Sequence, residues 1–392
     1  MSELIYPRER TLGGITLVLG VLVWVGLIVG TFGTALIGLL FGFIMYLFVQ
    51  SALIAHIKGN GVEISELQFP DLYKQFTFCC DRLQIKERPN AYMLNGNGSL
   101  NAFATKFLGS HFVVLMSDVV DAMATHADGV KFYIGHELGH IKMKHIGGSL
   151  LRWPVLWLPL IGGAYSRAKE STCDRHGLAC CETSDGAGRA LVVLSAGVER
   201  WKDLNIQEYS RQNQYSSGFW MSLHELLSGY PWVTKRVARL IDPAAKEPKR
   251  NVFAYVFAIF VPYAGRMGSG FGLLIMVYII GVLAAIAIPQ FVNYQAKTHI
   301  ASVITESQPI RDALAGTYFD TKDIPTLEKI GASDSLSDGS KISINEENMV
   351  LTVTLKEGEL LFVPSIDGEG HVVWECRGGE SMLPAQLPES CK

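Results

Sequence analysis

The stretch His136-Glu137-Leu138-Gly139-His140 decides most about this chain, because its two histidines stand four positions apart. In an α-helix residues i and i+4 lie on one face, so both imidazoles can reach one zinc ion. Glu137 can take a proton from a water molecule held there and later pass it to a leaving amine. The flanking residues, from Gly129 to His145, are typical of a buried helix. Such a match arises by chance in about one chain in a hundred of this length, so the motif needs support from elsewhere.

Two acidic residues further along the chain provide that support. Glu170 and Asp174 are again four positions apart and therefore share a helix face. Catalytic zinc usually takes three protein ligands, which makes Glu170 the expected third ligand. Asp174 is then expected to accept a hydrogen bond from the second ring nitrogen of a ligating histidine. The alternative is a solvated helix with both carboxylates in water.

Together these motifs resemble the membrane zinc peptidases of the HtpX and CAAX-prenyl-protease family, over roughly residues 1–242. The stretch Ser99 to Thr105 is similar to the family's Asn-Ala-Phe-Ala segment, and Pro231 to Leu240 is similar to its late basic helix. Tyr230 stands where the family commonly has a histidine, which leaves Tyr230 and Arg236 as candidate donors to a developing oxyanion. The resemblance implies an α+β zincin-type domain, one Zn²⁺ per chain, and protein or peptide substrates.

The N-terminal part of the chain reads as a transmembrane hairpin. Apolar residues make up 49% of the chain and charged residues 18%, against about 25% charged in ordinary soluble domains. The run from Thr11 to Ile57 contains no Asp, Glu, Lys or Arg and is long enough for two spans, with a turn at 30–34. A cleaved signal peptide is the alternative, but the run is too long for one. Basic residues at both ends place those ends, and the zinc site, in the cytoplasm; they are Arg8, Arg10 and Lys58.

Between the hairpin and the zinc helix the patterns alternate between helix and strand. They predict helices at 74–83 and 118–127 and strands at 89–94 and 111–116. Zinc peptidases of this kind hold substrate as an added strand along a sheet edge. We take 111–116 as the candidate edge strand, with an interior strand as the alternative.

The segment after the zinc motif and the nearby His145 each allow two interpretations. The segment from Leu150 to Tyr165 is apolar but carries an arginine and two prolines. It is expected either to lie on the membrane surface, with its tryptophans at the headgroups, or to pack in the core. His145 follows His140 by five residues, off the ligand face, and is either a surface residue or an outer partner of the metal site.

The C-terminal third resembles a different family. The segment from Gly281 to Tyr294 is similar to the N-terminal helix of type IV pilins and type II secretion pseudopilins. The resemblance, over roughly residues 268–392, implies a long helix packed on an antiparallel sheet and a disulfide between Cys376 and Cys391. Gly268 and Gly272 stand where pilins carry the first mature Phe and the assembly Glu, so we expect a tethered, uncleaved pilin-like domain. Its strands are predicted at 341–344, 349–355, 360–363 and 371–375.

These patterns give four predicted regions. Residues 1–58 form the transmembrane hairpin and 59–245 the cytoplasmic peptidase domain. Residues 246–291 hold a membrane-associated segment and a third transmembrane helix, and 292–392 the exported pilin-like domain. The stretch Gly270–Ile288 is long enough to span, whereas Val252–Ala264 is too short. Three spans in a bacterial inner membrane would put the cysteine pair in the oxidising periplasm and the other five cysteines in the cytoplasm. If 252–264 also crossed, the C-terminal domain would be cytoplasmic.

The predicted function is that of a membrane-bound zinc endopeptidase, which by resemblance acts in quality control of membrane or misfolded proteins. One alternative is a pilin-like binding or assembly factor that docks with a pilus or type II secretion apparatus, with the peptidase secondary or latent. Another is a zinc site that hydrolyses something other than peptides. No phosphate-binding loop or DNA-binding motif occurs, and the net charge of −3 gives no reason to expect a nucleic-acid partner.

Overall fold

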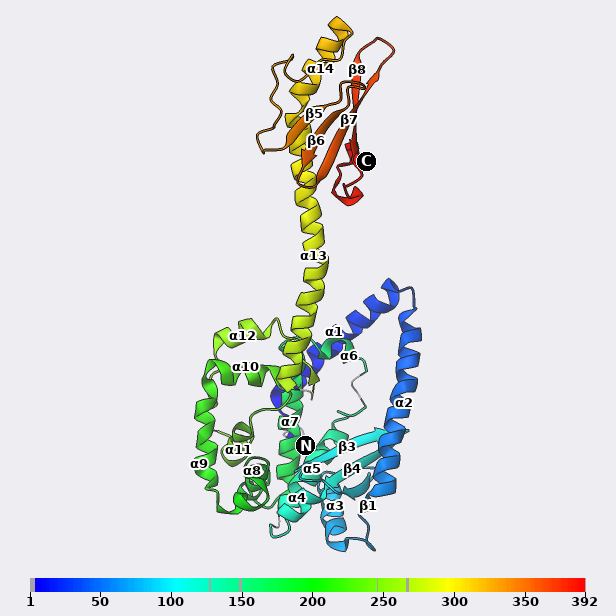
Figure 1. Cartoon of the computed structure of the whole chain (residues 1–392). Coiled ribbons are helices and arrows are strands. Elements are labelled where there is room, and N and C mark those ends of the chain that lie inside the picture. The colour runs from blue at the N-terminus through cyan, green and yellow to red at the C-terminus, as the bar shows by residue number, and fades with distance from the viewer. Residues whose placement is uncertain (1–3, 127, 148–149, 245, 266–267, 392) are drawn as a thin grey trace. The chain divides into compact units, whose positions relative to one another are not determined.

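The computed structural model describes residues 4–126, 128–147, 150–244, 246–265 and 268–391. The chain divides into two compact units, Met1–Val277 and Tyr278–Lys392, which Figure 1 colours from blue to yellow-green and from yellow to red. The boundary falls inside one long helix, α13, Gly268–Glu306. Both units contain helices and strands, so the predicted α+β class is confirmed. The finer domain boundaries given above stay predictions.

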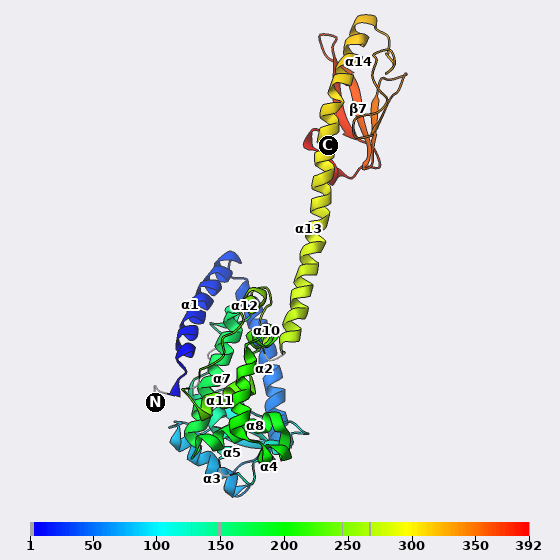
Figure 2. The ribbon, with the colours of Figure 1, turned by 90° about the vertical axis from the view of Figure 1, so that its left-hand side faces the viewer.

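Two long apolar helices begin the first unit. They are α1, Pro7–Gly30, and α2, Ala35–Asn60, and they meet at the turn expected from the sequence (Figure 2). Among the described residues, three helical stretches are long and apolar enough to cross a membrane: these two and Gly270–Thr321. The helix α12, Val252–Ala258, has 7 residues, about 10 Å at 1.5 Å per residue, which is too short to span.

The sheet of the first unit corrects one expectation. Its strands lie in the order β1-β2-β4-β3, so β4, Ser110–Met116, is an interior strand and the expectation that 111–116 forms the edge is wrong. The physical reason is visible in the sequence, because Phe112 to Leu115 is a continuous apolar run that the structure buries, as an interior strand requires. The neighbouring edge strand is β3, Ala102–Phe107, which pairs antiparallel with β4. The other strands are β1, Val62–Glu63, and β2, Asn90–Leu94, which runs parallel to β4.

Five helices make the main body around this sheet. The central one, α5, contacts β3 and β4 as well as α3 and α7. Its contact with α7 is close because Gly135 has no side chain: a Cβ there would lie 2.8 Å from Cys180 Sγ and 2.9 Å from the His176 carbonyl oxygen. The helices of this body are α3, Pro70–Arg82; α5, Gly129–Lys142; α7, Ile161–Cys180; α8, Ser184–Arg200; and α11, Val233–Ile241.

Smaller helices complete the unit. The helix predicted at 118–127 is shorter in the structure, since α4 is Ser117–Ala122 and residue 127 lies outside the described residues. The segment 150–165 contains α6, Trp153–Leu156, and lies along α1, where the rings of Trp24 and Trp153 stack with centroids 6.2 Å apart. Trp153 and Trp157 are exposed and therefore do not belong to a core; the membrane-surface interpretation of this segment stays a prediction. The remaining helices are α9, Ile206–Arg211, and α10, Phe219–Leu227.

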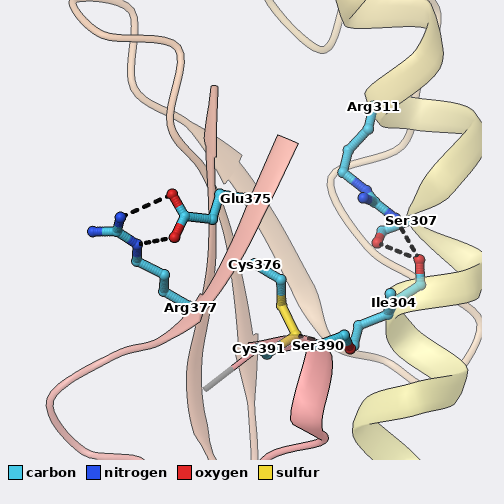
Figure 3. Close-up of a disulfide and its surroundings, with 8 residues drawn as sticks. All are labelled: Ile304, Ser307, Arg311, Glu375, Cys376, Arg377, Ser390 and Cys391. Atoms are coloured by element: carbon cyan, nitrogen blue, oxygen red, sulfur yellow. Dashed lines mark hydrogen bonds and ion pairs between the residues drawn. A yellow bond between two sulfur atoms is a disulfide. The ribbon is translucent and has the colours of Figure 1, made fainter. Parts of the chain in front are cut away.

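The second unit packs helices on one antiparallel sheet. Residues of α13 and α14, Gln308–Thr321, share a core with the strands; among them Ile300, Leu314 and Phe362 are fully buried. The disulfide between Cys376 and Cys391 closes the C-terminal loop against the last strand, as Figure 3 shows. The strands follow one another in the order β5, Lys341–Ile344; β6, Leu351–Leu355; β7, Gly358–Ile366; and β8, Val372–Gly378, close to the four predicted.

Candidate metal centre

The helix α5 presents the three residues of the opening motif on the wall of one small cavity. His136, Glu137 and His140 are all buried, and the two imidazole rings have centroids 5.2 Å apart. The cavity has a volume of about 70 Å³. Both candidate oxyanion donors, Tyr230 and Arg236, also line this cavity. Its other lining residues are Asn101, Ala102, Phe132, Tyr133, Glu170 and Leu194.

Glu170 reaches this cavity from α7. Its Oε2 lies 3.2 Å from His136 Nε2 and its Oε1 lies 3.7 Å from His140 Nε2. Burial raises the pKa of Glu170, but the hydrogen bond from His136 and nearby positive charge outweigh burial and lower that pKa to about 2, so the group is a carboxylate. Burial lowers the pKa of His140 to about 3, so that imidazole is neutral. Two ring nitrogens and a carboxylate that converge in this way fit a tetrahedral zinc ion with one position open.

Cys173 is a second candidate for the third ligand. Ligand atoms of His136, His140 and Cys173 all lie within 4.8 Å of one another. Cys173 Sγ lies 3.6 Å from His145 Nδ1, the atom that contacts His140 Nδ1. The Glu170 oxygens instead lie near the Nε2 atoms of His136 and His140. We therefore favour Glu170.

The choice between the two can be tested by substitution. Glu170→Gln is expected to lower zinc affinity by more than about 100-fold, beyond the 10- to 100-fold typical of an outer partner. Cys173→Ser is expected to leave zinc affinity within about twofold, because the sulfur lies beside His145 Nδ1 and the two Nε2 atoms face Glu170. Competition with a chromogenic chelator measures both. Loss of zinc in Cys173→Ser with retention in Glu170→Gln would assign the sulfur instead.

Asp174 lies behind His136, in the place expected for an orienting acceptor. His136 Nδ1 is 3.0 Å from Asp174 Oδ1, so the imidazole donates there and turns Nε2 towards Glu170. Arg236 holds the same carboxylate twice, through Nε at 2.9 Å and Nη2 at 2.6 Å. Burial works against the charge of Arg236, but Asp174 outweighs it and raises the pKa of Arg236 further. The guanidinium is therefore engaged with Asp174, which favours a positioning role for Arg236.

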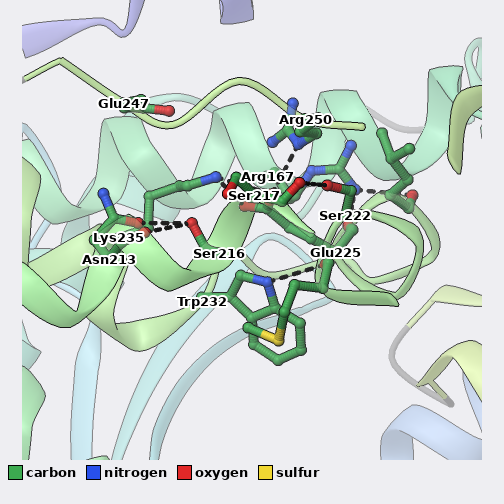
Figure 4. Close-up of polar contacts among 12 residues, drawn as sticks. Arg167, Asn213, Ser216, Ser217, Ser222, Glu225, Trp232, Lys235, Glu247 and Arg250 are labelled. Carbon is green, nitrogen blue, oxygen red and sulfur yellow. Dashed lines mark hydrogen bonds and ion pairs between the residues drawn. The ribbon is translucent and has the colours of Figure 1, made fainter. Parts of the chain in front are cut away.

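Tyr230 reaches the cavity from the loop after α10, and its side chain is partly exposed. Arg167 of α7 anchors this loop, because its Nη1 donates to the carbonyl oxygens of Glu225, Leu226 and Ser228 at 2.7, 3.0 and 2.6 Å. The Glu225 carboxylate in turn accepts from buried Lys235 and from Arg250. Figure 4 shows this cluster of buried charges.

His145, for which two interpretations stood open, is an outer partner of the site. After α5 ends, Lys144 adopts a left-handed conformation with φ of 58°, and the chain turns so that His145 N–H donates to the His140 carbonyl oxygen. The two Nδ1 atoms of His140 and His145 then lie 3.0 Å apart. Sequence reasoning missed this contact because a five-residue spacing on an unbroken helix points away from the ligand face.

Comparison with known proteins agrees with both parts of this structure. The model of peptidase family M48 matches residues 66–164, a range that includes the motif on α5 and ends before Glu170. The type IV major fimbrial protein FimA of Dichelobacter nodosus is 32% identical over 105 residues, which cover 26% of this chain and 64% of that protein. Two fimbrial proteins of Pseudomonas aeruginosa are each 30% identical over 123 residues, covering 27% of this chain and 80% of their own length. No solved structure matches the chain significantly.

The M48 match lies within the first unit. The chain thus has a region similar to peptidase family M48, and a part of about a quarter of its length belongs to the fimbrial proteins.

Proposed function

We propose that the chain is a membrane-bound zinc endopeptidase. The observation that carries the proposal is the convergence of His136 Nε2, His140 Nε2 and the Glu170 carboxylate beside Glu137 in one cavity. A zinc ion held by these three side chains would supply a Lewis acid that polarises the scissile carbonyl and acidifies water.

Several residues around the metal site then have separate roles in hydrolysis. Glu137 takes the proton of the attacking water and later delivers it to the leaving amine. Tyr230 donates a hydrogen bond to the oxyanion of the tetrahedral intermediate, since Arg236 is held by Asp174. Asp174 keeps His136 oriented, and the electrostatic environment keeps Glu170 ionised at neutral pH.

The edge strand β3 offers a place for the substrate backbone. Among the described residues β3 pairs with β4 alone. Its first residue, Ala102, and the preceding Asn101 line the cavity with Glu137. A peptide added along β3 would form sequence-tolerant backbone hydrogen bonds. This arrangement favours unfolded proteins as substrates and is the basis for placing the enzyme in quality control of membrane or misfolded proteins.

Product analysis tests the reaction class. Purified protein in detergent is expected to convert an unfolded soluble protein into fragments with new amino termini, and to leave model esters and phosphoesters intact. Hydrolysis of an ester or phosphoester without cleavage of the unfolded protein would point to a hydrolase that does not act on peptides.

For the topology we propose a bacterial inner membrane, with the zinc centre in the cytoplasm and the C-terminal unit exported. Support comes from the three apolar stretches and from the disulfide, because disulfides persist in oxidising compartments. Protease added to intact spheroplasts is expected to remove the C-terminal unit and to spare the zinc domain until the membrane is opened. Protection of both units in intact spheroplasts would contradict this topology.

The similarity to fimbrial proteins favours a second role for the C-terminal unit, as an exported pilin-like module that recognises substrate or docks with a pilus or secretion apparatus. The absence of Phe and Glu at Gly268 and Gly272 argues against a filament subunit. Deletion of residues 292–392 is expected to leave cleavage of an unfolded protein intact. Loss of cleavage would instead make this module part of the peptidase.

A further inference from the structure

The N-terminal membrane helix contributes a buried carboxylate to the surroundings of the metal centre. Glu9 lies in the first turn of α1, and its Oε1 is 2.8 Å from His145 Nε2. The side chains of His145 and Glu9 are only 4% and 7% exposed. A carboxylate buried in protein is costly unless it is paired or hydrogen-bonded.

The hydrogen atoms of this chain of contacts can be assigned from its ends. If His140 uses Nε2 for the metal, Nδ1 carries its hydrogen and donates to His145 Nδ1, 3.0 Å away. The remaining hydrogen of a neutral His145 is then on Nε2, where it donates to the Glu9 carboxylate. His145 Nδ1 also lies 3.6 Å from Cys173 Sγ, but its contact with His140 Nδ1 is shorter, at 3.0 Å.

Each of the two ligating histidines is therefore connected to a carboxylate by hydrogen bonds. His136 donates directly to a carboxylate, Asp174, which Arg236 holds in place. His140 reaches a carboxylate through His145, and that carboxylate is Glu9. Partners of this kind fix the orientation of a ligating imidazole and raise its basicity.

Glu9 can fill this role because the start of α1 is firmly docked. Tyr6 N–H donates to Thr172 Oγ1 of α7 at 3.0 Å. The guanidinium carbons of Arg175 and Arg239 lie 5.3 and 5.4 Å from the centroid of the Tyr6 ring. These contacts place the first turn of α1 on the helix that also carries Glu170.

We propose that Glu9 and His145 are positioning residues of the metal centre, which couple the first membrane helix to the zinc affinity of His140. The proposal rests on the proposed function in taking His140 as a ligand. It gives α1 a task beyond anchoring, because a shift of this helix would withdraw the carboxylate from His145 and weaken zinc binding.

The test measures zinc affinity of the full-length protein in detergent by competition with a chelator. Glu9→Gln keeps the shape of the side chain and an acceptor for His145, but removes the charge, and is expected to lower zinc affinity by about 10-fold. His145→Ala is expected to lower it by about 10- to 100-fold. Arg8→Gln, at the exposed neighbouring position on α1, is the matched control with unchanged affinity.

Two further readouts separate positioning from packing. The double variant Glu9→Gln/His145→Ala is expected to bind zinc no more weakly than His145→Ala alone, since both changes break one chain of contacts. In Co²⁺-loaded protein, Glu9→Gln is expected to shift the visible absorption bands. Wild-type affinity in Glu9→Gln, additive losses in the double variant, or an equal fall in the thermal midpoint of metal-free protein without any affinity change would overturn the proposal. A wild-type protein that binds no zinc would instead refute the proposed function.

Discussion

Replacing Glu137 by Gln is expected to lower kcat/KM for cleavage of an unfolded protein by about 10²- to 10⁴-fold, the usual contribution of a positioned acid and base. The amide cannot accept the proton of the attacking water, although it keeps the size of the carboxylate. Glu137 lines the cavity but stands one residue away from the nearest ligand on α5, so zinc content should not change. Initial rates at several substrate concentrations, on samples of equal zinc content, measure the effect.

The matched control is Glu199→Gln, a surface position whose side chain is 80% exposed. It is expected to keep wild-type kcat/KM. Undiminished cleavage in Glu137→Gln would show that Glu137 is not the general base and would contradict the proposed mechanism.

Replacing Glu225 by Gln is expected to destabilise the first unit by about 3–5 kcal/mol, the cost of removing one partner from a buried ion pair. Lys235 Nζ lies 2.9 Å from both Glu225 oxygens, and the two side chains are 1% and 0% exposed. Arg250 Nε donates to the same carboxylate at 2.7 Å. Without the negative charge, the buried Lys235 and the partly exposed Arg250 lose the carboxylate that they share. The thermal midpoint in detergent should fall by roughly 10 °C, given a few degrees per kcal/mol in a domain of this size.

Glu208→Gln serves as the control, because Glu208 pairs with Arg211 on the surface, with side chains 62% and 66% exposed. Such exposed pairs contribute about 0–1 kcal/mol, so its midpoint should stay close to wild type. Equal midpoints for Glu225→Gln and wild type would mean that the buried charges tolerate the loss of their partner. Burial raises the pKa of Glu225, but Arg250 and Lys235 outweigh it and lower that pKa. The stabilisation by this cluster is therefore present at neutral pH and is lost as pH falls through the lowered pKa.

The sequence was most informative where chemistry depends on helical spacing. The spacing of His136 and His140, and that of Glu170 and Asp174, placed each pair on one helix face, and the structure brings both faces together. Local pattern also located the apolar helices and the strands of the second unit, because each signal lies within one element.

The missed features depend on contacts between distant segments. The residues around β4 do not determine which strands pair with it, so the edge position of β3 is known only from the pairing order in the structure. The partnership of Glu9 with His145 joins positions 136 residues apart, and it needs the left-handed turn at Lys144. A signal for it existed in the carboxylate at the start of an apolar helix, since such a group rarely remains without a partner.

The most direct test of the account is the zinc-to-protein ratio of the wild-type chain purified in detergent, measured on the same sample whose cleavage of an unfolded protein is assayed. The account predicts one zinc per chain, loss of cleavage when a chelator removes it, and recovery when one equivalent of zinc returns. Cleavage that persists in metal-free protein, or a chain that binds no zinc at all, would contradict it.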